Sequence, residues 1–295
     1  MGSRGVGSSV ASAIDIALWD IRGQQLGLPI YDLLGGSIRN SIALYTHPDG
    51  NFDPENIAAA CRKIVAQGFT TVKTGPFPNY CPEGVQAYIS GQVDEAGEEL
   101  GVAMIAAMRE AVGPGIEILI DCHGQFDVPT AIRLAGRLEP YHIGWFEEPL
   151  PPESLHALRQ VRERTNVPIC VGERMYTRFD FLPVLEGRLA EFIMPDVTWT
   201  GGISELKKIS TLAETYHIPV SPHDAGGPVN IAAGAHVMAT VPNFYKLEIS
   251  RARLDLYPLM MDHPFDIRDG HLNLSSRPGL GFEMNLEFLR ERQLN

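Results

Sequence analysis

Short apolar segments alternate with amphipathic segments along most of the chain. Eight of the apolar segments are bounded by turn residues and predict strands, at 41–47, 70–75, 116–124, 144–149, 168–173, 191–196, 219–224 and 244–249. Between them, apolar residues three or four positions apart predict helices, including 54–67, 99–112 and 204–216. Alternating strands and helices predict parallel βαβ units, and eight strands are typical of a closed α/β barrel. An open doubly wound sheet is the alternative, although no glycine-rich dinucleotide turn follows the first strand.

Three regions follow from this pattern. A predicted helix over 11–25 belongs to a linker, 1–39, that leads into the barrel. The barrel, with the active site, is expected at 40–261, and the irregular segment 262–295 is expected to pack outside it. The polar stretch 79–98 precedes the third strand and is either a loop on the catalytic face or a surface excursion.

The composition argues against several other classes of protein, including nucleic-acid-binding and membrane proteins. The 295 residues include 24 Lys and Arg against 36 Asp and Glu, a formal net charge of −12, and 44 % are hydrophobic. Such a chain has the apolar content for a sizeable core, and its acidic balance argues against nucleic acid as a partner. No apolar run reaches the roughly 18 to 20 residues of a membrane helix, and the N-terminus lacks the apolar core of a signal peptide. The cysteines show no paired spacing, which favours reduced thiols in a cytoplasmic protein.

Six ionisable residues recur near the ends of consecutive predicted strands, at intervals of 26, 26, 23, 27 and 25 residues: Asp121, Glu147, Glu173, Asp196, His223 and Glu248. Because α/β barrels build their active sites at the C-terminal ends of the strands, we expect these side chains to converge on one small volume. Polar residues that merely precede a loop would explain one or two of these positions, but not six in register.

Three of these residues, Asp121, Glu147 and Glu173, are carboxylates on neighbouring predicted strands. Their mutual repulsion is costly unless a cation lies between them. Oxygen ligands favour a hard cation and an open site favours Mg²⁺, whereas zinc would require more His or Cys, so the sequence predicts a magnesium site. Glu148 competes with Glu147 for the inward position, because adjacent residues of a strand face opposite ways.

Two histidines and a lysine are candidates for the chemistry itself. His223 is a candidate general base, because Asp196 on the adjacent strand would fix its tautomer, although a buried structural histidine shows the same pattern. His123, two residues after Asp121 on the same predicted strand, faces the same way and is either a fourth metal ligand or a proton donor. The two histidines would then flank a substrate. Lys73 ends the second strand and either holds a substrate carboxylate or is exposed and solvated.

These residues lie in segments that together resemble the enolase superfamily, mandelate racemase subgroup, and within it the acid-sugar dehydratases of the galactonate and gluconate type. The segments run from about residue 12 to 283: SAIDIALWDIRGQQLGLPIYDLLGG, IDCHG, WFEEPLPPE, VGERMYTRFDF, MPDVTWTGGISELKKI, SPHDAGGPV, YKLEIS and RPGLGFE. The resemblance implies a TIM-like (β/α)7β barrel and Mg²⁺ as the cofactor. It also implies that the family's N-terminal α+β capping domain is absent, since the chain begins close to the linker helix.

The resemblance implies a role for most of the candidate residues. It assigns metal ligands (Asp121, Glu147 and Glu173), a His–Asp dyad that acts as base (His223 and Asp196), an acid (His123) and a contact to the substrate or the developing enolate (Glu248). Lys73 and Arg174 are expected to bind substrate as well. Racemases of the subgroup carry KxK at the end of strand two, whereas this chain has Lys73-Thr74-Gly75, so their second base is absent.

The predicted function is Mg²⁺-dependent dehydration of a sugar acid to a 2-keto-3-deoxy acid, by removal of the C2 proton and loss of the 3-hydroxyl group. A racemase or epimerase is the alternative within the superfamily, and the missing second base counts against it. A non-catalytic barrel, inactivated by loss of the cap, is the alternative from another class. The expected partner is a small sugar acid, and the expected assembly is a homo-oligomer that binds neither nucleic acid nor membrane.

Overall fold

The computed structural model describes residues 4–49, 52–77, 91–250 and 254–292. The chain forms two compact units. The first unit draws on Met1–Leu44, Glu173–Leu182 and Met194–Asn295, and the second on Tyr45–Gly172 and Pro183–Ile193. Most of the stretch 79–98, expected to be a loop or a surface excursion, lies outside the described residues.

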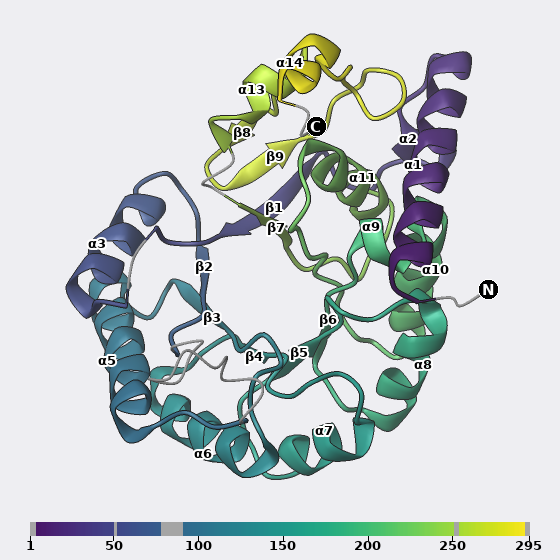
Figure 1. Ribbon diagram of the computed structural model, residues 1–295. Helices are drawn as coiled ribbons and strands as arrows, with labels where there is room; N and C mark the ends of the chain where they lie inside the picture. Colours follow the sequence, from purple (N-terminus) through teal and green to yellow (C-terminus); the bar gives the residue numbers. More distant parts are fainter. Residues whose placement is uncertain (1–3, 50–51, 78–90, 251–253, 293–295) are drawn as a thin grey trace. The chain divides into compact units, whose positions relative to one another are not determined.

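Parallel strands form the sheet of the second unit, so the α/β class predicted from the sequence is confirmed. They pair in sequence order: the end of β1 (Ser41–Thr46), β2 (Thr71–Thr74), β3 (Glu117–Asp121), β4 (Trp145–Glu147), β5 (Ile169–Val171) and β6 (Phe192–Ile193). Helices of this unit lie along one side of the sheet (Figure 1): α3 (Pro54–Val65), α5 (Glu95–Val112), α6 (Val128–Leu138) and α7 (Leu155–Arg162). A 3-10 helix, η1 (Glu139–Tyr141), follows α6. Helix α8 (Thr177–Gly187) begins in the first unit and ends in the second.

The strands carry the core of the second unit. In β3, Ile118, Leu119 and Ile120 are fully buried, which is the burial that a continuous apolar run predicts for a strand covered on both faces. The register pairs Asp121 with Glu147, so the last residues of β3 and β4 lie side by side. Carboxylates predicted to end successive strands are therefore neighbours in the sheet.

Aspartates determine where two of the helices begin. The Asp53 side chain accepts a hydrogen bond from the Asn56 backbone N–H at 2.8 Å and caps α3. The Asp94 side chain accepts from the Gly97 N–H at 2.7 Å and caps α5. Because of this cap, α5 begins at Glu95 rather than at residue 99, the start predicted from apolar spacing.

Helices dominate the first unit. They are α1 (Val6–Leu26), α2 (Ile30–Leu33), α9 (Val197–Thr200), α10 (Gly202–Thr215), α11 (Pro228–Met238), α13 (Tyr257–Met260) and α14 (Leu286–Glu291). The strands β7 (Leu247–Ile249), β8 (Ile267–Arg268) and β9 (His271–Asn273) accompany them, and β9 pairs antiparallel with both β8 and the start of β1. Figure 1 shows α1 running alongside α10, and β8, β9, α13 and α14 grouped near the C-terminal end.

The apolar stripe that predicts α1 is not the face through which this helix packs. Ile14 and Leu18 are more than half exposed, whereas Ser12 and Gly23 are buried. A Cβ at Gly23 would lie 2.6 Å from the Gly279 Cα, so only glycine permits this close approach. Among the described residues, none of the helices has both the length and the apolar character needed to cross a membrane.

The segment 219–224, predicted as the seventh strand, forms no regular ladder with the described strands. Val220 makes an isolated parallel bridge with Phe244, and no strand is assigned to the rest of the segment. Pro219 and Pro222 lack the N–H groups that a ladder needs, which explains the interruption. The first unit therefore positions the residues after 220 through single hydrogen bonds rather than through a sheet.

Candidate metal centre and acid–base site

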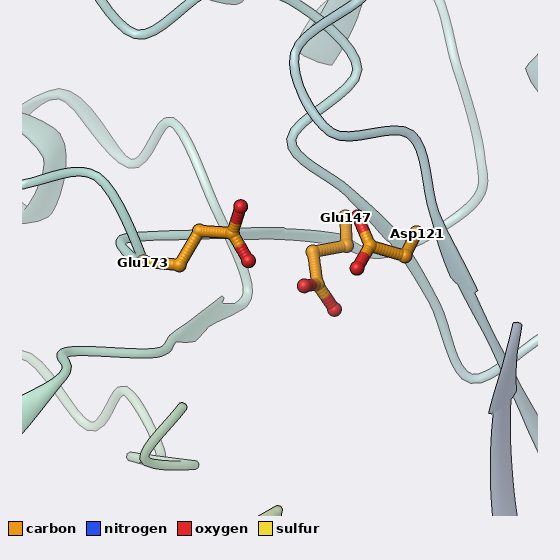
Figure 2. A group of neighbouring side chains, drawn as sticks. All are labelled: Asp121, Glu147 and Glu173. Carbon is orange, nitrogen blue, oxygen red and sulfur yellow. The ribbon is translucent and has the colours of Figure 1, made fainter. Parts of the chain in front are cut away.

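Three carboxylates gather at the carboxyl ends of neighbouring strands. Asp121 ends β3, Glu147 ends β4, and Glu173 follows β5 by two residues. Since β5 pairs with β4 through Cys170 and Glu147, the chain that leaves β5 delivers Glu173 to the same edge of the sheet. One carboxylate oxygen of each residue lies within 4.8 Å of the others, and Figure 2 shows the three side chains turned toward a common space.

This donor set suits a hard divalent cation. Asp121, Glu147 and Glu173 are all buried, and buried carboxylates at this separation repel one another when no cation balances them. A set of carboxylate oxygens without His or Cys is what Mg²⁺ prefers. The group contains Glu147 and not its rival Glu148, which lies beyond β4 at φ 35° and donates its N–H to the Cys170 carbonyl at 2.9 Å. The grouping predicted from the spacing is observed, and the residues present fit Mg²⁺.

Lys73 places a buried ammonium group among the carboxylates of the second unit. Its Nζ lies 2.8 Å from Oε1 of Glu147 and 3.3 Å from Oδ2 of Asp121, and its side chain is 1 % exposed. Trp145 donates its Nε1–H to the other oxygen of Glu147 at 2.9 Å. The interpretation of Lys73 as an exposed, solvated lysine is therefore wrong, whereas its predicted contact with substrate remains a prediction.

His123 lies beside Asp121, although not for the reason predicted. Strand β3 ends at Asp121, and a φ of 52° puts His123 in the left-handed region beyond the strand. The turn brings the His123 N–H to Oδ1 of Asp121 at 2.9 Å and its ring Nε2 to 3.3 Å from Oδ2. About half of the His123 side chain is exposed, so the imidazole is accessible to a bound molecule. Its role as an acid remains a prediction.

A histidine–aspartate dyad lies within the first unit. Nδ1 of His223 is 2.8 Å from Oδ2 of Asp196, and both residues are buried. A carboxylate only accepts hydrogen bonds, so Nδ1 carries the proton and Nε2 is left as the basic nitrogen of the neutral ring. Nε2 faces Oε2 of Glu173 at 3.4 Å. The pairing of Asp196 with His223 agrees with the sequence prediction.

Negative charge surrounds His223. Burial by itself lowers the pKa of His223, but the hydrogen bond to Asp196 and the charges of Glu248, Glu173 and Asp196 outweigh burial and raise this pKa to about 9. The surroundings therefore favour the charged imidazolium, which is the form that a general base reaches once it has taken a proton.

Sequence reasoning missed the residues that hold Asp196. Thr198 donates both its N–H and its hydroxyl to Oδ1 of Asp196, at 2.7 and 2.6 Å, and Asp196 thereby caps α9. Asn230 on α11 donates its side-chain amide to both Asp196 oxygens, at 3.2 Å each. A lone Asn in the otherwise apolar run that follows the SPHD segment was the signal that could have identified Asn230.

Two predicted residues of the first unit remain, Glu248 and Arg174. Glu248 is the middle residue of β7, is buried, and accepts from the Asp224 N–H at 3.2 Å. Burial and the charge of Glu248 raise the pKa of Asp224 to about 7. Arg174 places a guanidinium nitrogen 3.3 Å from Oε1 of Glu173. That Glu248 and Arg174 bind substrate remains a prediction.

Parallel strands that end in buried carboxylates, together with a buried His–Asp dyad, are typical of α/β enzymes that combine a divalent metal with acid–base catalysis. Residues 56–288 match the enolase C-terminal domain-like family. Residues 5–35 match the N-terminal domain of the mandelate racemase and muconate lactonizing enzyme family. The chain therefore belongs to the enolase superfamily, and the resemblance inferred from the sequence is confirmed.

Several of the similar proteins are named as sugar-acid dehydratases. The chain is 38 % identical to the D-galactonate dehydratase of Pectobacterium atrosepticum, over 97 % of its own length and 74 % of that protein. It is 34 % identical to the D-gluconate dehydratase of Thermoproteus tenax, over 98 % of its own length and 57 % of that protein. A mandelate racemase/muconate lactonizing enzyme-like protein from Rubrobacter xylanophilus has a similar structure, with a TM-score of 0.90 at 38 % identity over 97 % of this chain and 77 % of that one.

Proposed function

We propose that the chain dehydrates a sugar acid of the galactonate or gluconate type to a 2-keto-3-deoxy acid. One observation carries this proposal: the buried His223–Asp196 pair occurs in a chain that is 38 % identical to a D-galactonate dehydratase. Dehydration at this position begins with loss of the weakly acidic C2 proton, which requires a positioned base. The dyad supplies such a base.

Two acid–base groups account for both proton transfers of the dehydration. His223 takes the C2 proton through Nε2, because Asp196 keeps the proton of Nδ1 in place. The electron pair of the broken C2–H bond forms the C2–C3 double bond as the C3–O bond breaks. His123 gives a proton to the departing 3-hydroxyl group, which leaves as water. The enol at C2 then tautomerises to the ketone of the 2-keto-3-deoxy acid.

The substrate carboxylate becomes more negative as C2 loses its proton, so positive charge is needed beside it. Asp121, Glu147 and Glu173 would hold Mg²⁺, whose chemistry when bound is to supply that positive charge. Lys73 and Arg174 would bind the substrate through its carboxylate.

Glu248, a buried acceptor, would bind a hydroxyl group of the substrate. In this proposed enzyme, residues 40–261 form the barrel that holds the active site, 1–39 form the linker, and 262–295 pack outside the barrel. The proposed enzyme is a cytoplasmic homo-oligomer that takes a small molecule and no nucleic acid.

Proton NMR in D₂O tests this function directly. Purified chain with Mg²⁺ is mixed with a panel of hexonates and pentonates, and EDTA is added to a parallel sample. We expect one or more acids to yield the 2-keto-3-deoxy product, and we expect EDTA to abolish it. Deuterium at C2 without loss of a hydroxyl group would instead identify a racemase or epimerase. An unchanged panel would contradict the proposed activity.

Two histidine variants test the assignment of the base, one at His223 and a matched control at an exposed histidine. His223→Gln removes the dyad and should abolish both product formation and exchange at C2. His271→Gln changes an exposed histidine on β9 and should leave the rate unchanged. Equal rates in the two variants would contradict the assignment of His223 as the base.

A further inference from the structure

Asn230 is a buried amide to which the proposed mechanism gives no role. It is the third residue of α11, and its side chain is 1 % exposed. Helix α11 is buried along almost its whole length, and most of its residues are apolar. Burial of a polar side chain in such a helix costs free energy unless the side chain is hydrogen-bonded.

The partner of Asn230 is the carboxylate of the dyad. The amide nitrogen lies 3.2 Å from Oδ1 and 3.2 Å from Oδ2 of Asp196, which is itself 1 % exposed. The nitrogen must face the carboxylate, because the amide oxygen would set the negative end of a dipole against an anion. Asn230 therefore spans both oxygens of Asp196.

The other donors to Asp196 each contact one oxygen. Thr198 donates twice to Oδ1, and His223 is bonded to Oδ2. If only Thr198 held the carboxylate, through Oδ1, the carboxylate could rotate about its Cβ–Cγ bond and move Oδ2 out of line with the His223 N–H. Asn230 opposes that rotation, because it also donates to Oδ2, the oxygen that His223 contacts.

The contact with Asp196 uses the amide nitrogen of Asn230 and leaves its amide oxygen unsatisfied. Its own Oδ1 is buried and has no hydrogen-bond partner within the described part of the chain. An apolar side chain of similar size would fill the same space without an orphaned acceptor, so packing alone does not account for an amide here. The contact with Asp196 does account for it.

We propose that Asn230 is a positioning residue for the catalytic base: it fixes the plane of the Asp196 carboxylate and so keeps Oδ2 aligned with Nδ1–H of His223. The kinetic consequence rests on the proposed function, in which His223 removes the C2 proton. The alignment itself rests only on contacts within the first unit. An amide performs this task without cancelling the charge of Asp196, because it is a neutral donor.

Kinetics of two Asn230 variants test the consequence for turnover. Asn230→Ala removes the amide and leaves a cavity, whereas Asn230→Leu removes the amide and refills the space. We expect both to lower kcat for sugar-acid dehydration by about 10- to 100-fold, as displacement of a catalytic group does, with KM changed by less than about 2-fold. A loss in the Ala variant alone would assign the effect to packing and overturn the proposal.

Asn243 offers a matched control outside the dyad. Its amide oxygen is also buried and has no hydrogen-bond partner among the residues that the structure describes, and its amide nitrogen donates to the carbonyls of Ser210 and Ile218 at 3.0 and 3.1 Å. Asn243→Ala should therefore retain the wild-type kcat. An equal fall in kcat in Asn243→Ala would mark general destabilisation and overturn the role of Asn230.

NMR of protein labelled with ¹⁵N at histidine gives a readout that needs no substrate. We expect a downfield imidazole N–H resonance that disappears in His223→Gln, weakens or broadens in both Asn230 variants and persists in Asn243→Ala. If no sugar acid is turned over, the proposed function fails while this spectrum still decides the alignment. An unchanged His223 resonance in both Asn230 variants would overturn the proposal whatever the kinetics show.

Discussion

A histidine held neutral by burial links the stability of the first unit to pH. His236 on α11 is 3 % exposed, accepts from the Tyr31 N–H through Nδ1 at 3.3 Å, and stacks on the Tyr31 ring with centroids 5.5 Å apart. Burial lowers the pKa of His236 from 6.5 to about 4, and a hydrogen bond to the Leu280 backbone opposes this only in part. The folded protein therefore excludes a proton that the unfolded chain binds.

The two pKa values fix the sign and the size of the effect. Between pH 6.5 and about 4, His236 is protonated in the unfolded chain and neutral in the folded one, so the free energy of unfolding falls as the pH falls. A difference of about 2.5 between the two pKa values, at about 1.4 kcal/mol for each pH unit, corresponds to a full loss of about 3 to 4 kcal/mol. Below the folded pKa both states bind the proton, and His236 causes no further loss.

Urea unfolding at a series of pH values from 7 to 4 measures this contribution. His236→Gln keeps an acceptor for the Tyr31 N–H but does not titrate, so between pH 7 and 4 we expect it to lose about 3 kcal/mol less than the wild type. His156→Gln makes the same change at an exposed histidine on α7 and should follow the wild type. Parallel pH dependence in the wild type and His236→Gln would refute the reasoning, because burial would then not hold His236 neutral.

Three further predictions test local features. Asp53→Ala removes the cap of α3 and should cost about 1 kcal/mol in urea unfolding. Gly101→Ala places a methyl group 2.4 Å from Phe77 and should cost about 1 to 2 kcal/mol, whereas Gly136→Ala on α6 meets nothing within 4 Å and should gain up to about 1 kcal/mol. His123→Ala should slow water loss by about 100-fold or more in the product NMR assay, and undiminished dehydration would contradict its role as the acid.

Sequence patterns predict strands well where both faces of a strand are buried. The run that contains Ile118, Leu119 and Ile120 has no polar face, so a strand was predicted there, one residue before its start and three residues past its end. The same reasoning failed at 219–224, because apolar content does not reveal that two prolines interrupt the hydrogen-bond ladder. It also failed for the packing face of α1, where small residues such as Ser12 are buried instead of the apolar stripe.

Regular spacing in the sequence predicted most residues of the candidate site. It did not reveal contacts between segments that are distant in the sequence. Carboxylates such as Asp121 and Glu147 recur with the βα unit, and the sheet register sets them side by side. His123 lies near Asp121 through a left-handed turn that alternation along a strand cannot indicate. Asn230 and Asp196 are 34 residues apart and meet only because α11 packs near α9, so no local pattern could pair them.

Glu147 of the candidate metal site and Asp196 of the dyad are held by different kinds of donor. The difference suits metal binding by Glu147 and support of the base by Asp196. Lys73 neutralises part of the charge of Glu147, and a divalent cation would neutralise more, so this carboxylate is held without losing its capacity to bind metal. Asp196 is instead held by neutral donors such as Asn230, which leave its charge directed at His223. A lysine in place of Asn230 would balance that charge and lower the pKa of His223, which would make it a weaker base. The amide thus orients the carboxylate and preserves the basicity of the histidine.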